Sequence, residues 1–155
     1  MPEYRGQLRA QGRVAILVSQ YNERVTSRLL EGALECCDAA GMPRDRVDVV
    51  WLPGAFELGG AAAVLAGTAR YSAIVALGAV VRGETAHFEF VAGEAARGLN
   101  EVAVRHGLPV AFGVLTTDTM AQAMARAGGD AGNKGYAATE AALRTADALA
   151  QLKGT

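Results

Sequence analysis

The sequence predicts an α/β fold in which a parallel sheet lies between two layers of helices. Four apolar runs rich in β-branched residues stand along the chain, at 13–18, 47–52, 73–81 and 109–115. The runs are continuous rather than alternating, which is typical of strands that are covered on both faces. Segments with helical periodicity separate them, and strands that alternate with helices form right-handed βαβ units. This alternation predicts a three-layer αβα sandwich.

The first two strands are each followed by a segment with the features of a helix. After 13–18, apolar residues recur at helical spacing over 25–40, with Asn22 as the predicted N-cap and Gly41 as the terminator. After 47–52, a second helix that carries the run AAAVLA is expected to begin near residues 53–54.

The last two strands are also followed by predicted helices. Residues 83–85 are expected to open the third helix, whose apolar stripe ends before Gly107. Thr119 and Gln122 have the spacing of a capping box, which predicts a short fourth helix that ends at about residue 127. The loop GGDAGN then precedes a last helix with one apolar side over 138–152.

Composition excludes several classes of function. The chain has 155 residues and a formal net charge of -1, with 20% charged residues of both signs. The composition does not shift along the chain, so we expect one domain over 1–155. There is no basic stripe for nucleic acid or an anionic membrane.

The location expected from the sequence is the cytoplasm. The start MPEYRGQLRAQGR lacks the apolar region of a secretory signal, and no run approaches the length of a membrane span. Cys36 and Cys37 are adjacent within an expected helix, which suits neither a structural disulfide nor a metal site. We expect them to be small buried thiols.

Ligands of parallel α/β sheets bind beyond the carboxyl ends of the strands. This rule selects four short segments, which are Tyr21-Asn22, 53–57, 82–87 and 116–119. Gly83-Glu84-Thr85 could hold a phosphate or carboxylate at a helix N-terminus, but ordinary helix capping explains the same residues.

His87 is the only histidine near a predicted strand end. Histidine is the side chain best suited to proton transfer near neutral pH, so His87 is a candidate acid–base residue. A surface or structural histidine remains the alternative from the sequence alone. His106 closes the same expected helix, where a cation interacts favourably with the helix dipole, and we interpret it as structural.

Other nucleotide, hydrolase and metal signatures are missing. GGDAGNKG only superficially suggests a phosphate-binding loop, because Lys134 precedes its glycine and the loop joins two helices. No G-x-S-x-G, H-E-x-x-H or G-x-G-x-x-G motif stands in a suitable place. Arg126 could clamp a phosphate or be a solvated charge, and Phe112 is most simply a core residue.

Four ordered motifs closely resemble those of the lumazine synthases. They are PGAFEL at 53–58, ALGAVVRGETAHF at 76–88, FGVLTTDTMAQAMARAG at 112–128 and GNKG at 132–135. The resemblance implies a flavodoxin-like sheet. It also implies condensation of 5-amino-6-(D-ribitylamino)uracil with 3,4-dihydroxy-2-butanone 4-phosphate to 6,7-dimethyl-8-ribityllumazine, the penultimate step of riboflavin biosynthesis. Phosphate and water are released, and neither a metal nor a redox cofactor is implied.

Family roles transfer to matching residues of this chain. Tyr21 resembles the ring that stacks on the pyrimidine, and 55–57 resemble the loop that holds the ribityl chain. His87 matches the proton-transfer histidine. The residues that match the phosphate site are Gly83, Glu84, Thr85 and Arg126. The residues that we expect at the substrates are Tyr21, Asn22, Gly54, Ala55, Phe56, Glu57, Val80, Val81, Arg82, Phe112 and Lys134.

The resemblance further implies a pentamer whose active sites lie between subunits, so that Phe112, Arg126 and Lys134 would reach in from a neighbour. The short connection at 128–132 resembles that of members that assemble twelve pentamers into a sixty-subunit shell. An N-terminal arm over 1–12 would add a strand to a neighbour's sheet. Riboflavin synthase is a candidate partner.

The sequence departs from the family pattern at three positions. Tyr21 stands where phenylalanine or tryptophan is usual, Gly59 replaces a usual proline, and Ala137 stands where glutamate is expected near Lys134. These departures leave open a flavin or lumazine carrier that has lost the chemistry. A purely structural shell subunit and a generic phosphate-binding α/β domain are the remaining alternatives.

Overall fold

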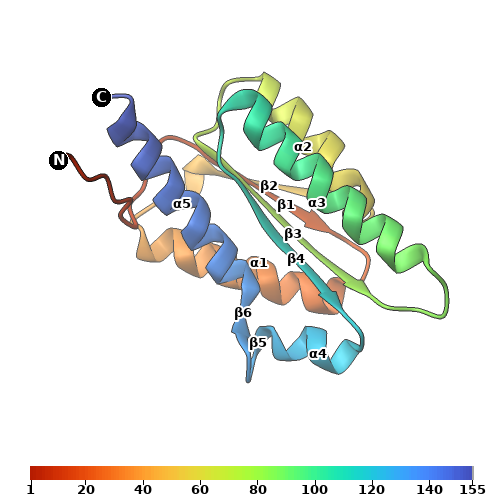
Figure 1. Ribbon diagram of the computed structural model, residues 1–155. Coiled ribbons are helices and arrows are strands. Elements are labelled where there is room, and N and C mark those ends of the chain that lie inside the picture. The colour runs from red at the N-terminus through yellow and green to blue at the C-terminus, as the bar shows by residue number, and fades with distance from the viewer. Residues whose placement is uncertain (155) are drawn as a thin grey trace.

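The computed structural model describes residues 1–154 and contains one four-stranded parallel sheet (Figure 1). The strands are β1 (Val14–Ser19), β2 (Val47–Leu52), β3 (Ala73–Val81) and β4 (Val110–Thr117), in the order β2-β1-β3-β4. Register is continuous, with Ile16 beside both Val49 and Val75. This order agrees with the predicted flavodoxin-like sheet.

Helices cover both faces of the sheet, as the alternation of elements predicts. The helices are α1 (Glu23–Ala39), α2 (Leu58–Gly67), α3 (His87–His106), α4 (Met120–Ala125) and α5 (Lys134–Leu152). Helices α1 and α5 pack on one face, and α2 and α3 pack on the other (Figure 1). Each central strand therefore sends alternate side chains into two cores. Ile16 and Val75 lie in the first core, and Leu17 and Ile74 lie in the second.

Edge strand β2 differs from the expectation that all four strands are covered on both faces. Val49 and Trp51 are 38% and 39% exposed, although they belong to a continuous apolar run. The expectation was wrong for β2 because it is one of the two edge strands, with only β1 beside it.

The helix boundaries correct two predictions. Helix α2 begins at Leu58, because the chain first forms a short 3-10 helix, η2 (Ala55–Glu57). Helix α3 begins at His87 rather than at 83–85, so His87 is its first residue. The backbone N–H of Arg82 still donates to Thr117 O, 2.9 Å away, which continues the pairing with β4 and delays the helix.

Other local features agree with the sequence more closely. Thr119 and Gln122 form the predicted capping box of α4, which ends at Ala125. A short hairpin, β5 (Ala127–Gly129) and β6 (Gly132–Asn133), replaces the expected plain loop. Another 3-10 helix, η1 (Arg44–Arg46), precedes β2.

The start of α5 packs closely on α1. A Cβ atom on Gly135 would overlap the carbonyl oxygen of Leu29, so only glycine permits this approach of the two backbones. Asn133 caps α5 by accepting hydrogen bonds from the N–H groups of Gly135 and Tyr136.

The N-terminal segment is bound to the other half of α5. Asp147 is buried, and its carboxylate accepts hydrogen bonds from the Gln7 N–H and the Gln11 side chain, both at 2.7 Å. Gln151 donates to the same carboxylate from one turn along α5. These contacts hold residues 7–11 against the helix.

Cys36 and Cys37 are free, fully buried thiols within α1, as the sequence predicts. Burial raises their pKa values to about 12 and about 11. None of the helices formed by residues 1–154 is long and apolar enough to cross a membrane.

Candidate active site

The carboxyl ends of β1, β2 and β3 open onto a cavity of about 550 Å³, a volume typical of small-molecule sites. Four segments contribute to it: the turn after β1, the segment after β2, the end of β3 and the first turns of α3. Its lining residues are Tyr21, Asn22, Gly54, Ala55, Phe56, Glu57, Ala79, Val80, Val81, His87, Phe90 and Val91.

Most of this lining matches the predicted site residues. Only Ala79, Phe90 and Val91 were not predicted. Phe90 and Val91 follow His87 by three and four residues, so helical periodicity places them on the same face of α3. That spacing was the signal that could have identified them.

Tyr21, Gly54 and Glu57 fit together at one wall of the cavity. The Tyr21 side chain is 74% exposed, and a Cβ atom on Gly54 would lie only 3.0 Å from its Cδ2 atom. The Glu57 Oε1 atom accepts a hydrogen bond of 2.9 Å from the Gly54 N–H. Glycine at position 54 therefore allows an aromatic ring and a carboxylate to approach the same peptide.

Asn22 connects the first strand end to the third. Its backbone is left-handed, with φ 61° and ψ 45°, and its side-chain amide donates to Ala79 O at 2.9 Å. Asn22 precedes α1 as predicted, but its side chain makes no capping hydrogen bond. It instead joins two walls of the cavity.

The loop after β3 is exposed and is held mainly at its first residue, Arg82. The Arg82 guanidinium donates to Asp118 at 2.8 Å and to Glu89 at 3.5 Å, and lies 4.4 Å from the centre of the Phe88 ring. Hydrogen bonding to Asp118, followed by the interaction with Glu89, raises the pKa of Arg82. Its charged head is therefore engaged outside the cavity lining.

The predicted phosphate residues of this loop lie beside the cavity rather than in its lining. Gly83, Glu84 and Thr85 are exposed and precede α3. Thr85 Oγ1 accepts a hydrogen bond of 3.3 Å from the N–H of His87. The loop leads directly into His87, which does line the cavity.

Comparison with known proteins identifies the family. The family model described as 6,7-dimethyl-8-ribityllumazine synthase matches residues 11–150. The chain belongs to this family. It is 50% identical over 143 residues to the 6,7-dimethyl-8-ribityllumazine synthase of Yersinia pestis (strain Pestoides F), with 92% of each chain covered.

Three residues that the lumazine synthase pattern predicts at the substrates do not reach the cavity within one chain. Phe112 pairs with Ala76 in the sheet, three residues before the strand position of Ala79 that borders the cavity. Arg126 is exposed, and its guanidinium donates to the carbonyl of Gln122 at 3.0 Å. Lys134 lies beside it, because the Lys134 N–H donates to Arg126 O at 2.9 Å.

These positions define two separate groups of lumazine synthase residues on one chain. The first group surrounds the cavity between β1, β2, β3 and α3. The second group, formed by Phe112, Arg126 and Lys134, lies on β4 and at the ends of α4 and α5. Among residues 1–154, no three or more histidine, cysteine, aspartate or glutamate side chains are grouped as they would be to hold a metal ion.

Proposed function

We propose that this chain condenses 5-amino-6-(D-ribitylamino)uracil with 3,4-dihydroxy-2-butanone 4-phosphate to give 6,7-dimethyl-8-ribityllumazine. The observation that carries the proposal is the convergence of nine predicted site residues, from four separate segments, on one cavity. The family membership of the chain supports the same reaction.

The wall formed by Tyr21, Gly54 and Glu57 suits the ribitylaminouracil. An exposed aromatic ring provides a stacking surface for the pyrimidine, and the hydroxyl of Tyr21 can remain in contact with water. Glu57 and the neighbouring backbone offer acceptors and donors for the ribityl hydroxyls. Backbone groups of Val80 and Val81 at the end of β3 would contact the polar edge of the heterocycle.

His87 is the proposed proton-transfer residue. The 5-amino group attacks the ketone and forms an imine with loss of water, after which phosphate is eliminated. The resulting enol tautomerises, and the ribitylamino nitrogen closes the second ring with loss of a further water. One histidine at the edge of the cavity can donate and accept protons in successive steps. Orientation of two bound substrates contributes at least as much to the rate as this proton transfer.

The phosphate of the second substrate would bind beside the cavity at Gly83, Glu84 and Thr85, where the chain turns into α3. The backbone N–H groups at the start of the helix and the Thr85 hydroxyl are suitable donors. Arg126 would supply the neutralising charge from a second subunit; within its own chain its guanidinium lies outside the cavity lining and donates to Gln122 O.

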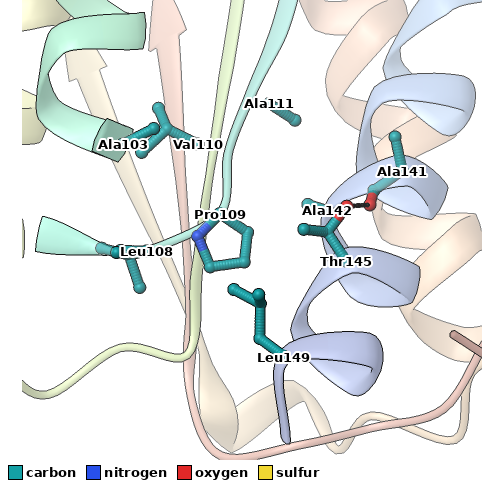
Figure 2. Close-up of a pocket in the computed structure, with 10 residues that line it drawn as sticks. Ala103, Leu108, Pro109, Val110, Ala111, Ala141, Ala142, Thr145 and Leu149 are labelled. Atoms are coloured by element: carbon teal, nitrogen blue, oxygen red, sulfur yellow. Dashed lines mark hydrogen bonds between the residues drawn. The ribbon is translucent and has the colours of Figure 1, made fainter. Parts of the chain in front are cut away.

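We therefore propose that the chain forms a closed ring in which each active site uses residues of two subunits. One surface that could contact a neighbouring subunit is the apolar surface around a second cavity, of about 350 Å³, beside edge strand β4 (Figure 2). Its walls come from the end of α3, the start of β4 and α5, and Pro109 and Leu149 are among the residues that line it (Figure 2).

Exposed apolar side chains also lie in the opposite helical layer, where Phe56 of η2, Val64 of α2, and Phe90 and Val104 of α3 are all more than half exposed. Two unlike faces that contact each other head to tail generate a ring when the rotation closes. The family resemblance favours five subunits. A light-scattering mass of one subunit would refute this part of the proposal.

The first experiment combines the purified protein with both substrates and follows product absorbance and fluorescence, after subtraction of their spontaneous condensation. We expect His87→Ala to lower kcat about 10²-fold without abolishing turnover. His106→Ala, which changes the only other histidine, is the matched control and should retain the original kcat. A rate equal to background, together with tight riboflavin or lumazine binding, would instead identify a carrier.

A mixing experiment tests the shared site directly. Arg126→Ala should raise KM for the sugar phosphate about tenfold or more, because hydrogen bonds to charged groups are strong. Dissociated His87→Ala and Arg126→Ala subunits are then mixed in equal amounts and reassembled. About a quarter of the interfaces would join an intact His87 to an intact Arg126 and recover activity. No recovery in reassembled rings would show that both residues act within one subunit.

A further inference from the structure

Arg82 connects three elements at the edge of the cavity. It is the first residue of the exposed β3–α3 loop, and its guanidinium contacts Asp118 beyond the end of β4 and Glu89 in the first turn of α3. The same guanidinium stacks on the Phe88 ring, an arrangement that favours a cation. Arg82 therefore joins both ends of the loop to the neighbouring strand.

Residues 83–87 have few other restraints. All five are exposed, and none belongs to either core. Within the described chain, the only side-chain hydrogen bond among them joins the His87 N–H to Thr85 Oγ1. The position of the loop therefore depends strongly on the contacts of Arg82.

Asp118 is well placed to fix Arg82. Its N–H donates to the Gln122 side chain at 2.8 Å, and Gln122 belongs to the capping box with Thr119 at the start of α4. The Asp118 carboxylate therefore extends from a turn whose position is fixed by the hydrogen bonds of Gln122 and Thr119. Asp118 does not line the cavity of its own chain, so within one chain its contact with the site passes through Arg82.

We propose that Asp118 is a positioning residue that orders the β3–α3 loop by holding Arg82. The ordered loop presents the N–H groups of 83–85 to a phosphate and sets the start of α3 at His87. The consequence for phosphate rests on the proposed function, whereas the ordering of the loop does not depend on it.

The expected effect is moderate, because the side chains of Arg82 and Asp118 are 45% and 66% exposed. Exposed ion pairs typically change an equilibrium about two- to fivefold. Loss of the pair should therefore loosen the loop without unfolding the protein. A looser loop in a protein of unchanged global stability would identify a positioning role rather than a contribution to the stability of the fold.

The test compares Asp118→Ala with Asp38→Ala in the full-length protein. Asp38 forms a similarly exposed pair with Arg44, through hydrogen bonds of 3.0 and 2.8 Å at the opposite end of α1 from the cavity. The first readout is amide hydrogen exchange at Arg82 and His87, whose N–H groups donate hydrogen bonds at the two ends of the loop, and the second is the Kd of inorganic phosphate measured by titration. Neither readout requires turnover.

We expect Asp118→Ala to accelerate exchange at Arg82 and His87 and to weaken phosphate binding, each about two- to fivefold, with no change of Tm. Asp38→Ala should change neither quantity. In the condensation assay, Asp118→Ala should raise KM for the sugar phosphate while KM for the uracil stays constant. Asp118→Glu keeps a carboxylate, so it should retain part of the exchange protection and part of the phosphate affinity that Asp118→Ala loses.

A double-mutant comparison tests whether the effect passes through Arg82. In an Arg82→Ala background, Asp118→Ala should cause no further change in exchange or phosphate affinity. Unchanged exchange at the Arg82 and His87 amides in Asp118→Ala would overturn the proposal, as would effects of Asp118→Ala that are equal with and without Arg82. If the protein proved not to condense the two substrates, the exchange and phosphate measurements would still decide the role of Asp118.

Discussion

Substitution of Asn22 tests how the turn after β1 is held in its conformation. Its left-handed backbone costs an ordinary L-residue about 1–2 kcal/mol, whereas glycine adopts it freely. Asn22→Ala and Asn22→Gly both lose the hydrogen bond to Ala79 O, so that loss cancels when the two are compared. Glycine also stabilises the unfolded chain by about 0.4–1 kcal/mol relative to alanine. We expect Asn22→Gly to be about 1 kcal/mol more stable than Asn22→Ala.

Urea unfolding followed by circular dichroism measures this difference, with all variants at one protein concentration because assembly affects apparent stability. Ala69 is the internal control, since it is the other non-glycine residue with a positive φ, 57°, among those the structure describes. It is exposed, and Ala69→Gly should stabilise the protein by a similar amount, about 1 kcal/mol. If Ala69→Gly is stabilising but the two Asn22 variants are equally stable, the turn after β1 does not retain its left-handed conformation and our reasoning fails.

Two further predictions concern buried polar groups. The Ser19 hydroxyl is fully buried and has no hydrogen-bond partner in the described chain. Ser19→Ala should therefore raise the free energy of unfolding by about 1 kcal/mol in the same urea assay. A loss of stability would instead reveal an unrecognised partner such as water. Asp147 has a lowered pKa, chiefly because it accepts a hydrogen bond from the Gln7 N–H, with Gln151 as a further donor. Its folded pKa lies below its unfolded value, so its stabilising effect is present above about pH 4 and is lost as pH falls through the folded pKa. Proteolysis of residues 1–12 should increase in that acid range, and Asp147→Asn should show no such transition.

The sequence predicted the sheet and the cavity because both depend on strong local patterns. Continuous apolar runs identified the strands, and the rule that ligands bind at strand ends selected Tyr21 and His87. The exposure of Trp51 could not be predicted in this way, because an apolar run has the same appearance in an edge strand and in a central one.

The start of α3 illustrates a second limit of local patterns. Gly83-Glu84-Thr85 has the composition of a helix start, but Arg82 remains paired with the end of β4 and the helix begins only at His87. That pairing depends on Thr117, which is distant in sequence. The separation of Arg126 from the cavity likewise depends on the path of the chain through α4.

The buried thiols of Cys36 and Cys37 give the folded chain a built-in chemical reporter. Thiolates are the reactive form of cysteine, and pKa values of about 12 and about 11 leave only a very small thiolate fraction near neutral pH. Both thiols are also closed to solvent, in the core that α1 forms with α5 and the sheet. An alkylating reagent can therefore modify them only when this core opens, and the rate of labelling would measure how often it does so.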